Sequence, residues 1–540
     1  MFFRNFFFIV ACMIFLATSS WCRARESCLD CHNDMKSGLS SGHDFSVQPC
    51  STCHGGNPDA TQLTIAHRGL IAFPGNLDNA LMTCGRCHAA QVASVTRSPM
   101  HTGTHMVQIT RRVFGQEATA EENLTLQALS KTPADSLLRK LCAGCHLGQA
   151  KTQHRHDVSR DRGGGCLACH LNNYPGGAHP ALSVKVEDGR CFGCHSRSSR
   201  IALSYAGLAE AEKYLLENTP TKVSRLADGR LVEHRQADVH HQAGMGCIDC
   251  HTGDGLMGAL ANTERQDQSV DISCSDCHDN QNPKVTLANW PDRYRGMLDR
   301  IPFPVTARQE FLTTGNGTPL WHIEIRNDEL LLYLKLAADT RAIPAYTSHD
   351  HRYEDEHTRL SCNACHAQWA PQCYACHLNF SPDDSQWDYT ERKFTPGLWS
   401  QRQAGIRNSL PPLGVTATGD ITTFVPGMIM SIDHPDFTVP LFRRLFGALS
   451  PHTTGPSRAC ESCHRSSVAL GLGEGRLENA AGQWSFHPAQ QALQDGLPAD
   501  AWTTLDAGHP GRASYPNDRS FNSGEMSRIL NNWRKAGSSD

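Results

Sequence analysis

The sequence has no excess of positive charge, because 50 Lys and Arg residues stand against 54 Asp and Glu residues, a formal net charge of -4. A strongly basic surface of the kind that binds nucleic acids is therefore excluded. Beyond the first two dozen residues, the sequence lacks any run of about eighteen consecutive apolar residues, which excludes a polytopic membrane protein. Cysteine and histidine are abundant instead, with 24 Cys and 29 His.

The N-terminus has the pattern of an export signal. Arg4 precedes an apolar run from Phe6 to Ala17, and Cys22-Arg23-Ala24 offers small residues at a plausible cleavage point. We therefore predict that residues 1–24 are a signal peptide and that the protein is exported, with an uncleaved membrane anchor as the alternative. Cleavage would remove two of the 50 basic residues and leave 48 against 54 acidic ones, a net charge of -6.

The remaining 22 cysteines all belong to one pattern, Cys-x-x-Cys-His, which occurs eleven times and leaves no cysteine over. The eleven copies are Cys28/Cys31/His32, Cys50/Cys53/His54, Cys84/Cys87/His88, Cys142/Cys145/His146, Cys166/Cys169/His170, Cys191/Cys194/His195, Cys247/Cys250/His251, Cys274/Cys277/His278, Cys362/Cys365/His366, Cys373/Cys376/His377 and Cys460/Cys463/His464.

This spacing suits covalent attachment of c-type haem. Two cysteines three residues apart lie on one side of a helical turn and form thioether bonds to the haem vinyl groups, and the adjacent histidine binds the iron. Four-cysteine zinc sites and disulfides are the alternatives, but neither requires a histidine after every second cysteine. The sequence therefore predicts eleven c-type haems, each held by one motif.

With these motifs, which extend from residue 28 to residue 464, the sequence resembles the multihaem c-type cytochromes of bacterial respiration. The resemblance implies haem attachment in the periplasm, in agreement with the predicted signal peptide. The more distant resemblance is to octahaem enzymes that oxidise hydroxylamine or reduce tetrathionate. No Cys-x-x-Cys-Lys motif occurs, so the sequence departs from the pattern of the multihaem nitrite reductases.

Eighteen histidines lie outside the motifs, enough to give all eleven irons a second histidine ligand. We predict that these distal ligands include several residues that lie close to motifs or resemble distal positions of multihaem cytochromes: His43, His67, His101, His105, His240, His357 and His452. Met100 and Met106 are alternative ligands that would raise the potential. The sequence does not assign distal residues to individual haems.

The motif spacing divides the chain into regions. We expect an eight-haem region at 25–278, a haem-free insert with a β-hairpin at 279–361, a three-haem region at 362–464 and a haem-free tail at 465–540. Regular structure looks sparse, with helical patterns at 133–141 and 525–536 and hairpin patterns around Asn327-Asp328 and Gly419-Asp420. The predicted fold class is a multihaem cytochrome, mostly α-helical and irregular loops wrapped around a haem chain, with minor β-hairpins.

Three functions fit this sequence. The favoured one is a periplasmic or cell-surface electron carrier that passes electrons along a chain of bis-histidine haems in anaerobic or extracellular respiration. The second is an oxidoreductase that acts on a small nitrogen or sulfur compound at one haem with an open coordination position. The third is a subunit of a cytochrome filament. The expected partners are redox proteins, namely a quinol-linked cytochrome, other multihaem cytochromes or an outer-membrane conduit, and no nucleic acid.

Overall fold

The computed structural model describes most of the chain in fourteen stretches. These are residues 27–36, 43, 49–116, 123–152, 162–172, 179–196, 201–211, 222–260, 265–279, 282–344, 357–374, 376–402, 405–507 and 512–532. The predicted signal peptide at 1–24 lies outside them. None of the described helices is both long enough and apolar enough to cross a membrane.

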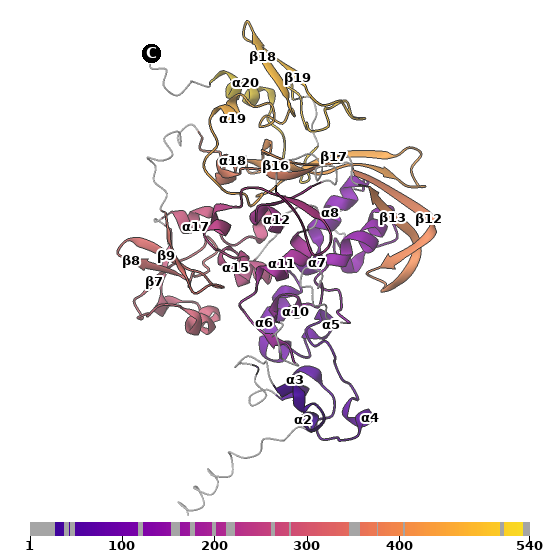
Figure 1. Cartoon of the computed structure of the whole chain (residues 1–540), viewed down its shortest axis with the longest axis vertical. Helices are drawn as coiled ribbons and strands as arrows, with labels where there is room; N and C mark the ends of the chain where they lie inside the picture. Colours follow the sequence, from indigo (N-terminus) through magenta and orange to yellow (C-terminus); the bar gives the residue numbers. More distant parts are fainter. Residues whose placement is uncertain are drawn as a thin grey trace, which may run out of the picture.

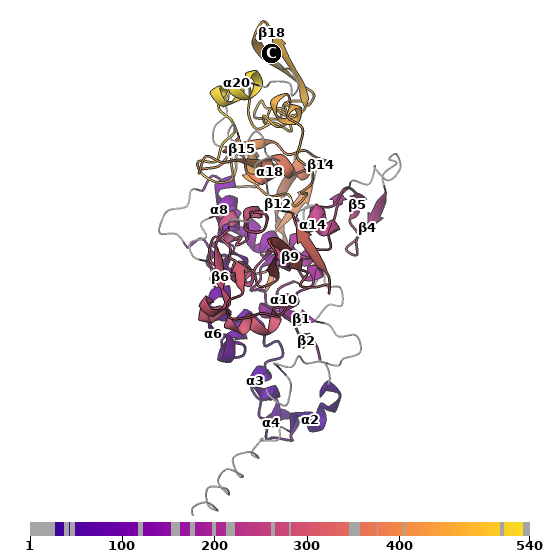
Figure 2. The same ribbon diagram turned by 90° about the vertical axis from the view of Figure 1, so that its left-hand side faces the viewer.

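The molecule is elongated, and its elements follow one another along the long axis roughly in sequence order (Figures 1 and 2). The N-terminal helices lie at one end and the C-terminal elements at the other, with a sheet on one side of the middle section. Segments from different parts of the sequence still meet: in Figure 1, helix α6 (Gly85–Val95) lies beside α10 (Cys166–His170), and helix α15 (Cys247–Cys250) lies beside α11 (Asp188–His195), which it contacts.

The described helices are short, and most of them carry a Cys-x-x-Cys-His motif or precede one. The motif-bearing elements are α2 (Cys28–Cys31), α3 (Cys50–His54), α6 (Gly85–Val95), η4 (Leu138–Cys142) with η5 (Ala143–Cys145), α10 (Cys166–His170), α11 (Asp188–His195), α15 (Cys247–Cys250), α17 (Cys274–His278), α18 (Cys362–His366) and α19 (Glu461–His464). The others are η1 (Asn33–Lys36), α4 (Leu63–Ala66), α5 (Leu77–Ala80), α7 (Pro99–Thr102), α8 (Thr104–Val113), η3 (Leu126–Ala128), α9 (Pro133–Leu137), α12 (Ala202–Tyr205), α14 (Val239–Gln242), α16 (Gly253–Leu256), η8 (Gln266–Ser269), η9 (Leu287–Asn289), η10 (Asp292–Arg300) and α20 (Ser523–Asn531).

The described strands are β1 (Leu171–Asn172), β2 (Ala181–Leu182), β3 (Leu208–Glu210), β4 (Val223–Arg225), β5 (Leu231–His234), β6 (Lys284–Thr286), β7 (Glu310–Leu312), β8 (Ile323–Arg326), β9 (Glu329–Tyr333), β10 (Thr340–Ile343), β11 (Ala370–Tyr374), β12 (Cys376–Asp388), β13 (Lys393–Arg402), β14 (Gly405–Ser409), β15 (Leu413–Val415), β16 (Ile421–Asp433), β17 (Leu441–Ala448), β18 (Gly475–Ala480) and β19 (Gln483–Pro488). The largest sheet has the order β13-β12-β16-β15, and β17 also pairs with β16. Its strands are antiparallel except for the parallel pair β12 and β16.

The predicted fold class is wrong in its mostly helical character. The structure is 30% helical and 26% strand, and the strands form a substantial curled sheet rather than minor hairpins (Figure 1). The sequence hides this sheet because its two longest strands are interrupted by residues that normally indicate turns. Strand β12 contains Ser381-Pro382-Asp383-Asp384 and β16 contains Pro426-Gly427, and each strand has a bulge at that point. Bulges absorb such residues without ending a strand.

The shorter elements lie where their sequence patterns indicate them. Strands β8 and β9 pair across Asn327-Asp328, whose φ angles of 50° and 65° are those of a type I′ hairpin turn. Strands β15 and β16 pair across Gly419-Asp420. Helix α20 begins after Asn522, whose side chain accepts a hydrogen bond from the Glu525 N–H. The described part of the second helical pattern thus ends at Asn531.

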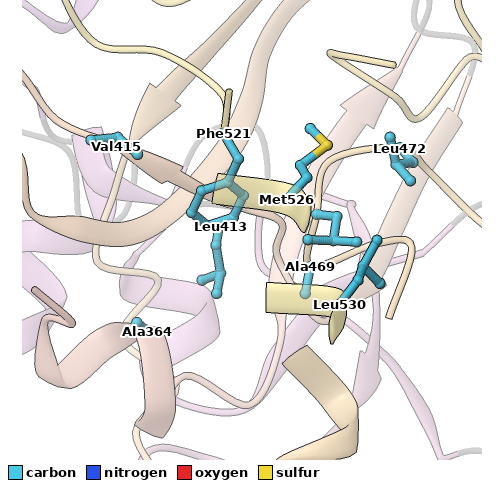
Figure 3. Close-up of a cluster of buried hydrophobic side chains, with 9 residues drawn as sticks. Ala364, Leu413, Val415, Ala469, Leu472, Phe521, Met526 and Leu530 are labelled. Carbon is cyan, nitrogen blue, oxygen red and sulfur yellow. The ribbon is translucent and has the colours of Figure 1, made fainter. Parts of the chain in front are cut away.

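One buried cluster joins a motif helix to the C-terminal part of the chain (Figure 3). Ala364, which lies inside α18 between Cys362 and Cys365, packs with residues of β15, α20 and the loop after α19. The other members are Leu413, Val415, Ala469, Leu470, Leu472, Phe521, Met526 and Leu530. The described segment beyond residue 464 is therefore a packed unit around the last motifs.

A buried ion pair holds the helix that leads into the Cys142/Cys145/His146 motif. Arg111 of α8 donates two hydrogen bonds of 2.8 Å to the Asp135 carboxylate of α9, whose side chain is fully buried. Asp135 also accepts hydrogen bonds from the Ser130 N–H and hydroxyl. Since π turn η4 follows α9 directly and ends at Cys142, this pair sets the position of the motif.

We expect the Asp135→Ala substitution to lower the free energy of unfolding by about 3–5 kcal/mol, because it leaves the Arg111 guanidinium buried without its carboxylate. Denaturant unfolding followed by far-UV circular dichroism measures this change. The matched control is Asp59→Ala, where the exposed side chain should contribute less than about 0.5 kcal/mol. Equal values for the two variants would contradict a structural role for the pair.

Candidate haem-binding sites

Ten of the eleven motifs lie on a helical turn, as attachment of c-type haem requires. In two of them an acidic residue inside the motif stabilises the start of the turn. Asp249 accepts a hydrogen bond of 2.8 Å from the Gly246 N–H, and Asp276 accepts one of 2.7 Å from the Ser273 N–H. Each carboxylate thus satisfies a backbone donor that the helix leaves unpaired.

The motif Cys373/Cys376/His377 is the exception. Cys373 lies in β11, Cys376 and His377 lie in β12, and residue 375 lies outside the described residues. Cys373 and Cys376 are buried, with 8% and 9% of their surface exposed, whereas His377 is exposed. The expected helical turn is therefore not formed here.

Cys87, in contrast to the buried Cys373 and Cys376, lies at the surface. The sequence assigns it to the haem-binding cysteines, but the structure leaves it exposed, together with the residues on either side. The reason is the orientation of helix α6, which buries Gly85 and Val92 and so turns Cys87, two residues after Gly85, towards the surface. Its thiol still lies in electrostatic contact with Cys53 of the preceding motif. The other exposed motif cysteines are Cys31, Cys274, Cys362 and Cys460.

Six motif histidines face a histidine from elsewhere in the chain. The distances between ring centres are 6.1 Å for His32 and His67, 5.9 Å for His54 and His179, 6.3 Å for His88 and His43, 6.2 Å for His251 and His452, 6.1 Å for His278 and His240, and 6.1 Å for His464 and His357.

These separations suit one iron between each pair. A metal–imidazole bond is about 2.0–2.1 Å long and the ring centre lies about 1.1 Å behind the nitrogen, so two ligands of one metal have ring centres about 6.3 Å apart. All six pairs join a motif histidine to a histidine from elsewhere in the chain, and their ring centres are 5.9–6.3 Å apart. The residues present therefore fit bis-histidine haem ligation.

The hydrogen bonds of motif histidines and of facing histidines support the same interpretation. Nδ1 lies 2.6–2.9 Å from a backbone carbonyl oxygen in five motif histidines, namely His54, His170, His278, His366 and His464. The facing residues His179 and His452 have the same kind of bond, at 2.9 Å each. A carbonyl only accepts, so Nδ1 carries the proton and Nε2 keeps its lone pair for a metal.

The motifs are also close to one another. The thiols of Cys84 and Cys166 are hydrogen-bonding neighbours, and so are the pairs Cys191 and Cys247, Cys145 and Cys194, and Cys274 and Cys362. Longer-range electrostatic interactions link Cys53 to Cys84 and Cys87, Cys169 to Cys191, Cys250 to Cys277, and Cys365 to Cys463. These neighbours place nine of the eleven motifs in one series from Cys53 to Cys463, which does not include the motifs at Cys28 and Cys373.

The predicted distal histidines divide into three groups. His43, His67, His240, His357 and His452 each face a motif histidine at the distance given above. His101 lies opposite His146, but the ring centres are 5.2 Å apart and the His146 Nε2 contacts the His101 carbonyl oxygen, which leaves too little space for an iron. His105 instead lies edge to face against Tyr515, 6.3 Å away.

His179 is the facing histidine that the sequence did not single out. It precedes Pro180, whose carbonyl oxygen lies 2.9 Å from Nδ1, and it is separated from its partner His54 by more than a hundred residues. No local spacing relative to a motif indicates it. Among the described residues, no histidine ring faces His170, His195 or His377. Apart from the motifs themselves, no group of three or more described His, Cys, Asp or Glu residues is arranged to hold a bare metal ion.

Comparison with known proteins found no matching protein-family model, no matching curated protein and no matching solved structure. The functional argument for this chain therefore rests on its own residues and their geometry.

The last motif is held by helix α20. The His464 Nδ1 lies 2.6 Å from the Ile529 carbonyl oxygen of that helix. At the start of the helix, the buried Glu525 carboxylate accepts hydrogen bonds from Arg519 and Arg359. Although burial alone would raise the pKa of Glu525, these guanidinium groups and the Asn522 N–H lower it to about 2.

We expect this clamp to make the C-terminal part of the protein sensitive to acid. A carboxyl whose pKa is lower in the folded state stabilises the fold above its unfolded pKa, near 4.5, and this contribution is lost as the pH falls towards 2. At pH 7 the Glu525→Gln variant should be less stable than the parent protein, by up to about 3 kcal/mol. Unfolding measured from pH 7 to pH 2 should show this difference shrinking. A difference that stays constant with pH would contradict the assignment.

Proposed function

We propose that this protein is an exported multihaem c-type cytochrome that carries electrons along a chain of covalently bound haems, in the periplasm or at the cell surface. The observation that carries the proposal is the set of six histidine pairs with ring centres 5.9–6.3 Å apart, each formed by a motif histidine and a second histidine. Two strong-field imidazole ligands leave no coordination position for a substrate, which favours electron transfer over catalysis.

The chain's own residues have three tasks in this proposal. The motif cysteines hold the haems by thioether bonds, and the paired histidines bind the irons from both sides. The carbonyl groups that bond Nδ1 keep each ring in the orientation and tautomer that ligation needs. The haem iron supplies the reversible one-electron chemistry. Contacts between cysteines of different motifs, such as Cys84 with Cys166 and Cys274 with Cys362, keep these haem sites adjacent.

The mass and the visible spectrum of the mature protein test this proposal. Expression in a host with the haem-attachment machinery should yield a red protein with eleven covalent haems, and the ferric spectrum should be low spin and insensitive to cyanide. A colourless protein, or cysteines that react as free thiols after unfolding, would reject it. A count of ten would leave the electron-carrier proposal in place, and the strand-bound motif Cys373/Cys376/His377 is the one that we would expect to be unloaded.

The second candidate is an oxidoreductase that acts at one haem with an open position. The observation that favours it is His195, which no described histidine ring faces and which lies near the pair of His251 and His452. In that case one ferric haem should be high spin and should bind cyanide. Loss of the high-spin signal in the His195→Ala variant would assign it to this motif.

A further inference from the structure

Among the facing histidines, His240 has a carboxylate as its hydrogen-bond partner. The Nδ1 of His240 lies 2.8 Å from the Oδ1 of Asp238, which also accepts the His240 backbone N–H at 2.9 Å. Because an ionised carboxylate only accepts, the imidazole donates its Nδ1 proton to it. For His54, His179, His452 and His464, the corresponding acceptor is a neutral backbone carbonyl.

Asp238 is held firmly in place. Its surface is 2% exposed, and its second oxygen, Oδ2, accepts the Thr454 N–H at 2.6 Å. The adjacent residue Val239 donates its N–H to the Thr454 carbonyl oxygen at 3.0 Å. The carboxylate therefore has a fixed position relative to two segments, the helix that carries His240 and the loop that carries His452.

A carboxylate acceptor changes how strongly an imidazole donates to iron. Hydrogen bonding to a negative charge draws the Nδ1 proton away from the ring and raises the basicity of Nε2, which stabilises ferric iron more than ferrous iron. Hydrogen bonding around the ligands is one of the means by which a protein sets a haem potential. A neutral carbonyl has the same effect only weakly.

His240 faces His278, so the haem concerned is that of the motif Cys274/Cys277/His278. Among the described thiol contacts, this motif joins the two halves of the series, since Cys277 is in electrostatic contact with Cys250 and Cys274 is a hydrogen-bonding neighbour of Cys362. In Figure 1, α17 lies above α15 and below α18 along the long axis of the molecule. A change in the potential of this haem therefore acts on transfer between the halves.

We propose that Asp238 is a positioning residue that lowers the reduction potential of the haem at Cys274/Cys277/His278 through His240, so that electrons crossing between the two halves of the haem series meet a low-potential step. This inference rests on the proposed haem ligation. The haem at Cys274/Cys277/His278 would then set the rate of electron transfer through the molecule.

The test compares redox titrations of the parent protein with those of Asp238→Asn and Asp238→Ser, monitored by optical and electron paramagnetic resonance spectra. Both substitutions remove the carboxylate. Asn and Ser are also good N-cap residues, so the side chain at position 238, just before helix α14, can still accept the hydrogen bond from the His240 backbone N–H. We expect one low-potential component to shift upwards in both variants while the number of haems and their low-spin state stay the same.

Asp271→Asn is the matched control. Asp271 is also a buried aspartate close to the motif, three residues before Cys274, but it accepts hydrogen bonds from Thr252, Thr314 and Asn316 and from no histidine. This variant measures the effect of removing a nearby negative charge alone. The shift in the Asp238 variants should exceed the shift in the control.

Three results would overturn the inference: unchanged potentials in both Asp238 variants, a control shift of equal size, or a new high-spin haem, which would mean that Asp238 only holds the ring in place. If one Asp238 variant does not accumulate with its haems, the other decides. The haem count of the parent protein is measured first, so failure of the proposed function shows there, before any variant is compared.

Discussion

If the proposed haem ligation is right, replacing His452 by glycine is expected to convert the haem of Cys247/Cys250/His251 from low spin to high spin. His452 faces His251 with ring centres 6.2 Å apart and nearly parallel planes, so its loss leaves the iron with one protein ligand. Glycine is chosen because His452 has a φ of 53°, a left-handed conformation that glycine adopts without strain. The electron paramagnetic resonance and visible spectra of the ferric protein measure the change.

Added imidazole should restore the low-spin spectrum of this variant by entering the space that the side chain leaves. The matched control is His234→Ala, because His234 hydrogen-bonds Ser224 in strand β5 and faces no described motif histidine. A His452→Gly spectrum identical to that of the parent protein would reject the assignment of His452 as a ligand. A spectral change in His234→Ala would show that the method does not distinguish ligands from other histidines.

Removing both cysteines of the central motif, in the variant Cys274→Ala with Cys277→Ala, should interrupt electron transfer between the two halves of the molecule. Among the described contacts between motif cysteines, those of this motif connect Cys250 on one side with Cys362 on the other. Without its haem, the sites at residues 362–377 and 460–464 lose this connection to the N-terminal sites. Electrons that enter at the N-terminal end should then reduce the C-terminal haems far more slowly.

A photosensitiser attached to a single introduced cysteine, in Asp59→Cys, can inject electrons at the N-terminal end, because every other cysteine of the mature chain belongs to a motif. The fast phase of haem reduction should be smaller in the central variant, since the C-terminal haems no longer take part. The control removes Cys142 and Cys145, whose motif is joined to the series by the contact of Cys145 with Cys194. That variant also lacks one haem, but its C-terminal haems should still be reduced in the fast phase. Equal behaviour of the two variants would contradict the series.

The sequence predicts the attachment motifs far better than their surroundings. A Cys-x-x-Cys-His pattern is local, and its helical turn follows from five consecutive residues, so ten of the motifs have the expected conformation. The hairpin at Asn327-Asp328 follows from equally local turn chemistry. The pairing of His54 with His179 is non-local, and nothing in the sequence near either residue indicates the other. The exposure of Cys87 is equally hidden, because it depends on which face of α6 packs against the rest of the chain.

The large sheet and the conformation of the motif Cys373/Cys376/His377 were missed for related reasons. Strand β12 begins at Cys376, inside a motif that elsewhere forms a turn, and its neighbours β13 and β16 hold it in an extended conformation from both sides. Tertiary pairing here overrides the local preference. His101 and His105 are four residues apart, a spacing that would place both on one face of a helix, yet helices α7 and α8 break at Gly103, so the two residues do not share one continuous helix.

The burial of Cys373 and Cys376 has a consequence for the order in which the protein matures. Their strands β11 and β12 pair with β14 and β16, which are contributed by residues 405–433, so the thiols become inaccessible once that later segment has folded. In the proposed cytochrome, haem attachment at this motif would therefore have to come before the sheet closes, while the chain is still emerging N-terminus first. A chain that folded first would keep two unmodified sulfurs in its interior.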